Sequence, residues 1–325
     1  MQNLWQENIL FAEKLRKQLH AHPELGWQEK NTASLVRRQL DALDIPWRAC
    51  AGTGTIAWLN KDAQGAAIAL RGDMDALPIE EQTGKAWQSV NQGCMHACGH
   101  DGHTATLLAT ARWLKHFETE LPQPVVLIFQ PAEEGLHGAR EMIKDGALEN
   151  VGAIYGWHNW PALPYGTMAC PDDIVMCGNG TFNMIFKGRG GHASQPELCA
   201  DPILAASAVN VALQQIISRR LAPQATAVIS VTQIHGGTAP TVIPETATLS
   251  GSIRVPDEDT RQQLNQHISE VATYTAAAYG VKCTIEHDMR YQATINHKEQ
   301  ATRARKEWQS LYGEPALHHG QALPI

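Results

Sequence analysis

The sequence has little positive charge for its length. Its 325 residues contain 26 lysines and arginines against 33 aspartates and glutamates, a formal net charge of −7 at pH 7. The basic residues form no cluster along the chain. Nucleic acids and acidic membrane surfaces attract proteins through basic patches. We therefore expect neither nucleic acid nor a membrane as a partner.

Long hydrophobic runs are missing from the N-terminus. Residues 1–19 place Glu, Lys, Arg and Gln among the apolar positions, whereas a signal peptide or a membrane-spanning helix needs an uninterrupted apolar core. The cytoplasm is therefore the default location. The seven cysteines are an odd number scattered through a large chain, which predicts reduced thiols rather than a disulfide framework.

Two common catalytic and cofactor motifs are also missing. The chain contains no G-x-S-x-G, so serine-hydrolase chemistry has no nucleophile elbow. Gly52-Thr53-Gly54 lacks the third glycine of a dinucleotide-binding loop, and Gly188–His192 leads into Ser194–Pro196 rather than into a helix. Nucleotide binding is not expected. With 43% hydrophobic residues the chain can bury a large core, and its length predicts two domains.

Helical and strand patterns alternate over the first half of the chain. Apolar residues recur at helical spacing over 3–21, 31–43 and about 104–117, and short apolar runs of strand length lie around them. The runs are Thr55–Leu59, Ala67–Leu70, Val125–Phe129 and Ala153–Gly156. This alternation predicts an α/β fold with a mostly parallel sheet flanked by helices.

A second pattern follows a connector at about 172–180 that contains Gly, Asp and Cys. The order there is β-α-β-β-α-β, which is typical of a small α+β domain. The strands are 181–188, 226–234, 246–254 and 283–287, and the helices are 201–217 and 257–279. We predict a first domain over residues 1–175, an inserted domain over 176–290 and a return to the first domain over 291–325, with a helix near 297–312.

Acidic and imidazole side chains follow three of the predicted strands. Asp73 and Asp75 follow the second strand, Glu133 and Glu134 the third, and His158 the fourth. Ligands gather at the carboxyl ends of the strands in open parallel sheets, so we expect these side chains at one edge of the sheet.

The segment Met95–His103 adds a thiolate and further imidazoles. Cys98 precedes a predicted helix, so Gly99 and Gly102 can bring the backbone close to a metal while the helix N-terminus stabilises the thiolate. Thiolate, imidazole and carboxylate together suit one or two divalent transition ions. The sequence therefore indicates a metal-dependent hydrolase.

Each of these elements also has a simpler interpretation. Asp73-Met74-Asp75 alone is usually a solvated turn, and Glu133-Glu134 could occupy the first turn of a helix. Cys94 and Cys98 could form a redox pair, and His158 could be a hydrogen-bonded core residue. Their joint occurrence at successive strand ends favours the metal site, because acids clustered beside apolar strands are costly without a cation.

Six motifs together resemble the M20 metallopeptidases. They occur in the right order over residues 10–320 and match the amidohydrolase branch, which includes hippurate hydrolase, N-acyl-amino-acid amidohydrolases and plant auxin-conjugate hydrolases. The motifs are Leu19–Leu25 (LHAHPEL), Arg71–Pro78 (RGDMDALP), His96–Asp101 (HACGHD), Phe129–Glu134 (FQPAEE), Gly190–Pro196 (GGHASQP) and Gly236–Pro240 (GGTAP). The resemblance implies a zinc-peptidase-like catalytic domain with an inserted dimerisation or lid domain.

The resemblance also implies a reaction and a set of metal ligands. The substrate would be a small N-acyl amino acid, cleaved at its amide bond with two divalent ions. Manganese or zinc would fill the site, and cobalt or nickel also suit mixed N, O and S ligands. Cys98 would bridge the two ions, His100 and His158 would complete one site, and Glu134 would contribute to the other.

Catalytic and substrate-binding roles follow from the same resemblance. Glu133 would be the general base, and Asp75 would orient a metal ligand. His192 of the inserted domain would reach the site of the second subunit in a homodimer and stabilise the oxyanion, and Arg254 would meet the substrate carboxylate. Thr241 stands at a substrate-orienting position where the family usually has Asn.

Members of the family continue through a segment that supplies a last histidine ligand, whereas this chain ends at Ile325. An alternative hypothesis is therefore a truncated, catalytically impaired member that retains the fold and the dimer interface. Metal content distinguishes the two hypotheses, since about two ions per chain are expected for the enzyme and at most one weakly held ion for the alternative.

Overall fold

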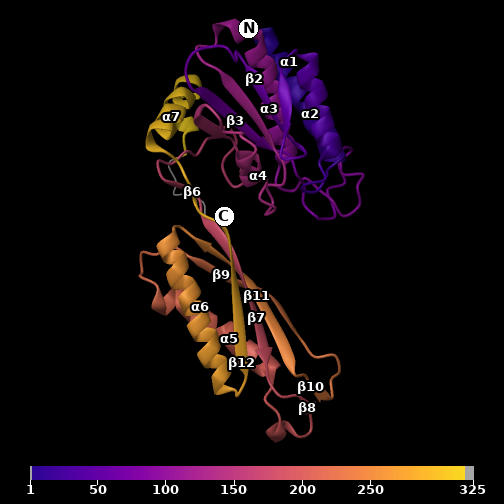
Figure 1. The fold of residues 1–325 in the computed structure, drawn as a ribbon, viewed down its shortest axis with the longest axis vertical. Helices are drawn as coiled ribbons and strands as arrows, with labels where there is room; N and C mark the ends of the chain where they lie inside the picture. Colours follow the sequence, from indigo (N-terminus) through magenta and orange to yellow (C-terminus); the bar gives the residue numbers. More distant parts are fainter. Residues whose placement is uncertain (1, 319–325) are drawn as a thin grey trace. The chain divides into compact units, whose positions relative to one another are not determined.

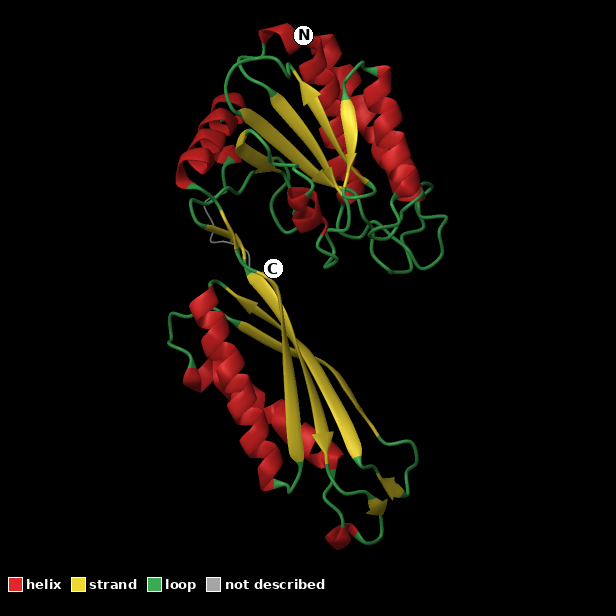
Figure 2. Cartoon of the chain, viewed as in Figure 1, coloured by secondary structure: helices red, strands yellow, loops and turns green. Residues whose placement is uncertain are grey.

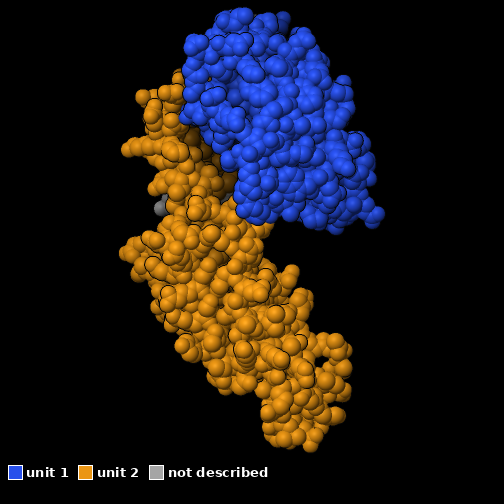
Figure 3. Space-filling model, in the orientation of Figure 1, with its two compact units in different colours: residues 1–162 blue, residues 163–325 orange. Residues whose placement is uncertain are grey.

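The computed structural model describes residues 2–318 (Figure 1). Contacts within the chain divide it into unit 1, Met1–Ala162, and unit 2, Leu163–Ile325, which Figure 3 colours separately. Each unit has its own sheet and its own apolar core.

Unit 1 contains a five-stranded mixed sheet with the strand order β1-β2-β4-β3-β5. The strands are β1 Trp47–Cys50, β2 Gly54–Leu59, β3 Ala67–Asp73, β4 Val125–Gln130 and β5 Val151–Gly156. Strand β3 runs parallel to both β4 and β5, whereas the β1–β2 and β2–β4 pairs are antiparallel. The carboxyl ends of three neighbouring strands therefore meet at one edge of the sheet.

Helices cover both faces of this sheet. They are α1 Gln2–Ala21, α2 Lys30–Ala42, α3 His100–His116 and α4 Gly138–Lys144. Strand β4 is buried along its whole length: Leu127 and Phe129 pack with residues of α1, α2 and α3, while Val126 and Ile128 pack with Met142 of α4. Burial on both faces explains its unbroken apolar run, since each such side chain contributes roughly 1.5–3 kcal/mol.

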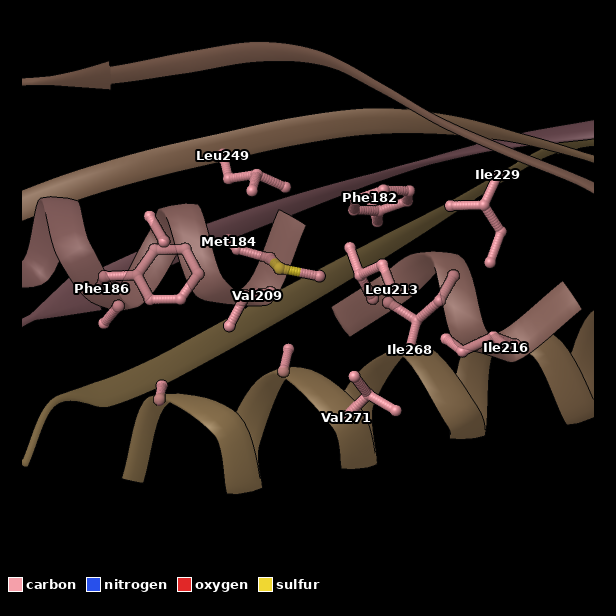
Figure 4. Packing of buried hydrophobic residues seen from close by; sticks show 14 of the residues in the cluster. Phe182, Met184, Phe186, Val209, Leu213, Ile216, Ile229, Leu249, Ile268 and Val271 are labelled. Atoms are coloured by element: carbon pink, nitrogen blue, oxygen red, sulfur yellow. The ribbon is translucent and has the colours of Figure 1, made fainter. Parts of the chain in front are cut away.

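Unit 2 contains a four-stranded antiparallel sheet with the order β12-β7-β11-β9. The strands are β7 Gly178–Lys187, β9 Val228–Gly236, β11 Thr246–Val255 and β12 Lys282–Tyr291. Helices α5 Pro202–Gln215 and α6 Glu258–Ala278 lie on one face (Figure 2). Alternate residues of β7, namely Phe182, Met184 and Phe186, point toward these helices and form the core with them (Figure 4).

Helices α5 and α6 of unit 2 each begin at an aspartate. The Asp201 side chain accepts hydrogen bonds from the backbone N–H groups of Ile203 and Leu204, and Pro202 occupies the first turn, where no backbone donor is needed. Asp257 accepts one from the N–H of Thr260. Each cap stabilises its helix by about 1 kcal/mol and fixes where it starts.

The remaining elements are mostly short. Strand β6 Ile174–Met176 pairs with β13 Thr294–Ile295, and β8 Gly191–His192 pairs with β10 Val242–Ile243. The others are helix α7 Lys298–Tyr312, the 3-10 turns η1 Glu118–Glu120, η2 Pro196–Leu198 and η4 Glu314–Ala316, and the π-helical turn η3 Ile216–Arg220. Within residues 2–318 no helix combines the length and apolarity needed to span a bilayer.

The predicted fold class is confirmed, with one difference inside the first sheet. That sheet is mixed because residues 47–59 form an antiparallel hairpin and β2 also runs antiparallel to β4.

All seven cysteines are free thiols. The chain divides into the two units between residues 162 and 163, ahead of the predicted boundary at 175. Residues 291–325 are grouped with unit 2 by their contacts. The three-part division and the return of 291–325 to the catalytic domain stay predictions, and residues 319–325 lie outside the described part.

Candidate metal centre

Three parallel strands deliver acidic and imidazole side chains to the same edge of the unit 1 sheet. Asp73 is the last residue of β3, Glu133 and Glu134 follow β4, and His158 follows β5. Cys98 and His100 come from the start of α3. The expected convergence at the carboxyl edge is therefore present in the structure.

One group of ligand atoms combines sulfur and nitrogen. Cys98, His100 and His158 each offer an atom within 4.8 Å of the others, and the Cys98 Sγ lies 3.4 Å from the His158 Nε2. The His158 Nδ1 lies 2.7 Å from the backbone carbonyl of Asn159 and must donate to it, so Nε2 carries the lone pair and faces the thiol. This is the ligating form of an imidazole.

A second group combines nitrogen and oxygen. His100, Glu133 and Glu134 also offer atoms within 4.8 Å of one another, and the His100 Nε2 lies 3.9 Å from Glu134 Oε1. His100 is fully buried and belongs to both groups. Two overlapping sets of donors therefore share one imidazole.

Several of these donor atoms are buried without a hydrogen-bond partner. Both ring nitrogens of His100 and the Oε1 of Glu134 have none among the described residues. An unpaired buried polar atom typically costs about 1–3 kcal/mol. Thiolate, imidazole and carboxylate donors suit a divalent transition ion, which would satisfy these atoms, so the residues present fit a metal.

Burial controls the ionisation of most of the ligands. It raises the pKa values of the Cys98 thiol and of the Glu133 and Glu134 carboxyls above their usual ranges. It lowers the pKa of His158, which keeps that imidazole neutral. The carboxyls and thiol therefore need a nearby positive charge to ionise fully, and a divalent ion would supply it.

Neighbouring acids control the ionisation of His100. Burial disfavours its charged form, but the interactions with Asp75, Cys98 and Asp73 raise its pKa to about 11. A proton on His100 thus balances the acids around it, and a metal ion would take the place of that proton.

The sequence pattern of peptidase family M20/M25/M40 matches residues 69–323. The chain belongs to peptidase family M20. It is accordingly a hydrolase of linear amide bonds, as its named relatives are.

Relatives of this M20 chain cover most of its length. N-acetylcysteine deacetylase of Bacillus subtilis (strain 168) is 38% identical over 313 residues, 95% of this chain and 81% of that protein. Hippurate hydrolase of Campylobacter jejuni is 38% identical over 307 residues, 93% of this chain and 79% of that protein. A solved dinuclear metal-binding M20 peptidase from Bacillus subtilis has a TM-score of 0.82 and 34% identity, over 98% of this chain and 84% of that one.

Asp75 anchors the loop that carries the two glutamates of this M20 chain. Its carboxylate accepts hydrogen bonds from the backbone N–H groups of Glu133 and Glu134, each at 3.0 Å. The same carboxylate lies 3.3 Å from the His100 Nδ1. Asp75 therefore holds elements of both donor groups, which is the arrangement expected of a residue that orients ligands.

Asp73 lies at the strand edge where metal ligands were expected, but its carboxylate contacts protein side chains. Asp73, His100 and His103 form a third group of potential ligands. However, one Asp73 oxygen lies 2.6 Å from the His103 Nδ1 and the other lies 2.7 Å from Arg71. Burial opposes ionisation, but Arg71 and the two histidines hold the pKa of Asp73 well below its usual range. Each of its two carboxylate oxygens therefore already lies close to a side chain of the protein, Arg71 or His103.

The roles of two residues at the site, His103 and Glu29, were not predicted from the sequence. His103 joins Asp73 to Asn159, and its position three residues after His100, on the same face of α3, could have indicated it. Buried Glu29 accepts a hydrogen bond from the N–H of Ala132, which has a φ of +51°, and so fixes the turn before the glutamates. Nothing near Glu29 in the sequence points to that role.

The three predicted substrate-binding residues all lie in unit 2. His192 of β8 pairs with Val242 of β10, and the N–H of Ala193 donates to the carbonyl of Thr241, so His192 and Thr241 are neighbours. Arg254 lies near the end of β11, eight residues beyond Thr246, which is roughly 27 Å along the strand. The structure brings the first two together and keeps Arg254 away from them.

Proposed function

We propose that this M20 hydrolase cleaves N-acyl amino acids at a centre of two divalent ions. The observation that supports the proposal most directly is the pair of overlapping donor groups that share His100. The B. subtilis peptidase of similar fold is described as dinuclear, and the named relatives include a deacetylase of N-acetylcysteine and a hydrolase of hippurate. A small amide with a free carboxylate is therefore the substrate class.

Four residues would hold the ions. They are Cys98, His100, His158 and Glu134, and the Cys98 thiolate would be the most strongly donating anion among them. Manganese or zinc is proposed, and cobalt or nickel fit the same ligands. When bound, such ions polarise an amide carbonyl and make water more acidic.

Glu133 would act as the general base. It belongs to the donor group around His100, and burial raises its pKa toward the range useful for proton transfer near neutral pH. Its carboxylate would take the proton of the attacking water and then deliver that proton to the leaving nitrogen. Asp75 would hold the Glu133 backbone during both transfers through its 3.0 Å hydrogen bond.

Unit 2 would complete the site through a homodimer. His192 and Arg254 lie too far apart along the sheet of unit 2 to contact one small substrate from the same chain. We therefore propose that Arg254 binds the substrate carboxylate in one subunit while His192 stabilises the oxyanion in the other. Thr241, beside His192, would orient the substrate.

One surface of unit 2 supports the proposal of a homodimer. Strand β9 forms an edge of the unit 2 sheet, so within residues 2–318 no strand pairs with its outer backbone groups. On the neighbouring helix α5 the side chains of Leu204 and Val211 are 54% and 74% exposed. An unpaired strand beside an exposed apolar helix face favours a symmetric contact between two copies.

The proposal is tested by metal content and by a substrate panel. We expect about two ions per chain after loading with manganese or zinc, and hydrolysis of some members of a panel of N-acyl amino acids that differ in acyl group and side chain. One weakly held ion or none, with no hydrolysis of any member, would instead support a catalytically impaired protein that retains the fold.

A further inference from the structure

A buried histidine outside the proposed ligand set connects the ends of two strands. The His103 Nδ1 lies 2.6 Å from the carboxylate of Asp73, at the end of β3. Its Nε2 lies 2.6 Å from the side-chain oxygen of Asn159 and 3.0 Å from the Asn159 backbone nitrogen, just beyond β5; with a proton it donates to the oxygen, and with a lone pair it accepts from the N–H. Both ring nitrogens are therefore bound, one to each strand end.

Asn159 in turn fixes the ligand that precedes it. Its backbone carbonyl accepts the Nδ1–H of His158 at 2.7 Å, and this contact leaves the lone pair on the Nε2 that faces Cys98. A rotation of the Asn159 peptide would remove that acceptor. The His158 ring would then lose its preferred tautomer and its orientation.

The Asn159 side chain also reaches the segment that carries Cys98. A Cβ built on Gly99 would lie only 2.2 Å from the Asn159 Oδ1, so this amide occupies the space that any other residue at 99 would need. Gly99 has a φ of +91°, which glycine adopts without strain. Asn159 thus packs against the residue that follows the thiol.

The other end of the connection is rigid. Arg71 lies 2.7 Å from the Asp73 carboxylate and donates to Gln130 at 2.8 Å. The Thr104 hydroxyl donates to the Asp73 carbonyl at 2.7 Å. Asp73 is fully buried among these partners, so it provides a fixed point for His103.

We propose that His103 is a positioning residue, which holds Asn159 against Asp73 and thereby sets the orientation of His158 and the place of Cys98. This assignment rests on the proposed function, because it concerns two of the proposed metal ligands. Hydrogen-bond partners behind metal ligands typically change metal affinity by about 10- to 100-fold.

Two substitutions separate positioning from structural support. His103→Asn places an amide where Nδ1 stood, so it keeps the partner of buried Asp73 and loses the contact with Asn159. His103→Gln reaches the position of Nε2, so it keeps Asn159 and leaves Asp73 short of a partner. His116→Asn, at the exposed end of the same helix, is the matched control.

The readouts are metal affinity, the cobalt–thiolate absorption of the Co²⁺-loaded protein and the thermal midpoint. We expect His103→Asn to bind Co²⁺ about 10- to 100-fold more weakly with an altered thiolate band, and His103→Gln to stay within about threefold of the parent. The thermal midpoint should be lower for His103→Gln than for His103→Asn, because only His103→Gln leaves buried Asp73 short of a partner. Metal affinity that follows the same order as the midpoints, or that changes in neither variant, would overturn the proposal.

A metal-free measurement keeps this result distinct from failure of the proposed function. The ¹⁵N chemical shifts of the His158 ring report its tautomer without any ion. We expect the Nδ1–H form in the parent and in His103→Gln, and a mixture of tautomers in His103→Asn. If the Co²⁺-loaded parent shows no thiolate band, the proposed function is wrong. If the tautomer of His158 is unchanged in His103→Asn, the positioning role of His103 is wrong.

Discussion

The two units of the chain bury different kinds of residue. Of the buried polar and charged residues in the described chain, all but Arg261 belong to unit 1, and they include Asp73, Asp75, His100 and His103 of the candidate metal centre. The core of unit 2 consists of apolar residues from β7, β9, β11, α5 and α6. A domain that buries unpaired donors is stabilised further by a cation, whereas an apolar core is complete by itself. We therefore expect metal binding, pH and substitutions in unit 1 to have the larger effects on activity and stability.

The largest effect is expected from a substitution of Cys98 in unit 1. Cys98→Ser should lower metal affinity by more than the roughly 100-fold upper value for supporting residues, because a hydroxyl is a much poorer bridging anion than a thiolate. Elemental analysis after dialysis measures it. Cys94→Ser is the matched control, since Cys94 belongs to no group of potential metal ligands found within residues 2–318. Equal metal in both variants and the parent would show that Cys98 does not bridge the ions.

The neighbouring glutamates should separate catalysis from binding. Glu133→Gln should retain metal and lower turnover by at least about 100-fold, the value typical of losing general acid–base catalysis. Glu134→Gln should lose metal first, because Glu134 Oε1 is a buried potential ligand atom with no hydrogen-bond partner among the described residues. Metal content and steady-state rates are measured on both variants. The reverse pattern would exchange the two assignments.

A mixing experiment tests whether unit 2 contributes to catalysis across a dimer. His192→Ala and Glu133→Gln should each be inactive alone. Refolded together in equal amounts, they should recover about a quarter of the parent activity, because half the dimers are mixed and each mixed dimer has one intact composite site. Heterodimer formation is followed by native mass spectrometry. Mixed dimers without activity would place His192 within its own subunit's site or outside catalysis.

The smallest expected effect is a pH dependence of stability located in unit 1. The hydrogen bond of His20 with Asp101 raises the pKa of His20 above its ordinary value, despite burial. The folded state therefore binds this proton more tightly, and the stabilisation is complete below about pH 6.5 and is lost as the pH rises through the higher folded pKa.

Urea unfolding of the metal-free protein between pH 6 and pH 9 measures this dependence. The free energy of unfolding should fall with pH above about 6.5, and His20 should contribute at most about 1.4 kcal/mol per pH unit to this fall. His20→Gln should show a flatter curve, and exposed His116→Gln should follow the parent. Identical slopes for the parent and His20→Gln would contradict the assignment.

The sequence was sufficient for the strands that carry the site but not for the contacts between their ends. The acids after β3 and β4 and the histidine after β5 could be predicted to converge, because parallel strands end at one edge. The link between Asp73 and Asn159 depends on the β3–β5 register and on the rotation of α3, which a linear pattern does not specify.

The first hairpin shows a different reason for a missed feature. Strand β1 was not predicted, because its four residues, Trp47–Cys50, are too short and too polar to form a distinct pattern. The turn to β2 uses positive φ at Ala51 and Gly52, 48° and 75°. Alanine rarely adopts that conformation, so the turn lacked its usual Asn-Gly or Asp-Gly signal.

Strand β4 also has a consequence for how the protein must be handled. Its segment Val125–Gln130 has no charge, high β propensity and burial on both faces, so an unfolded chain exposes a sequence that can pair with copies of itself. Pro122 and Pro124 precede the segment and Pro131 follows it. Proline lacks the backbone donor that a growing intermolecular sheet requires, so these residues limit such pairing to the segment itself. Refolding at low protein concentration should therefore give the highest yield of native chains.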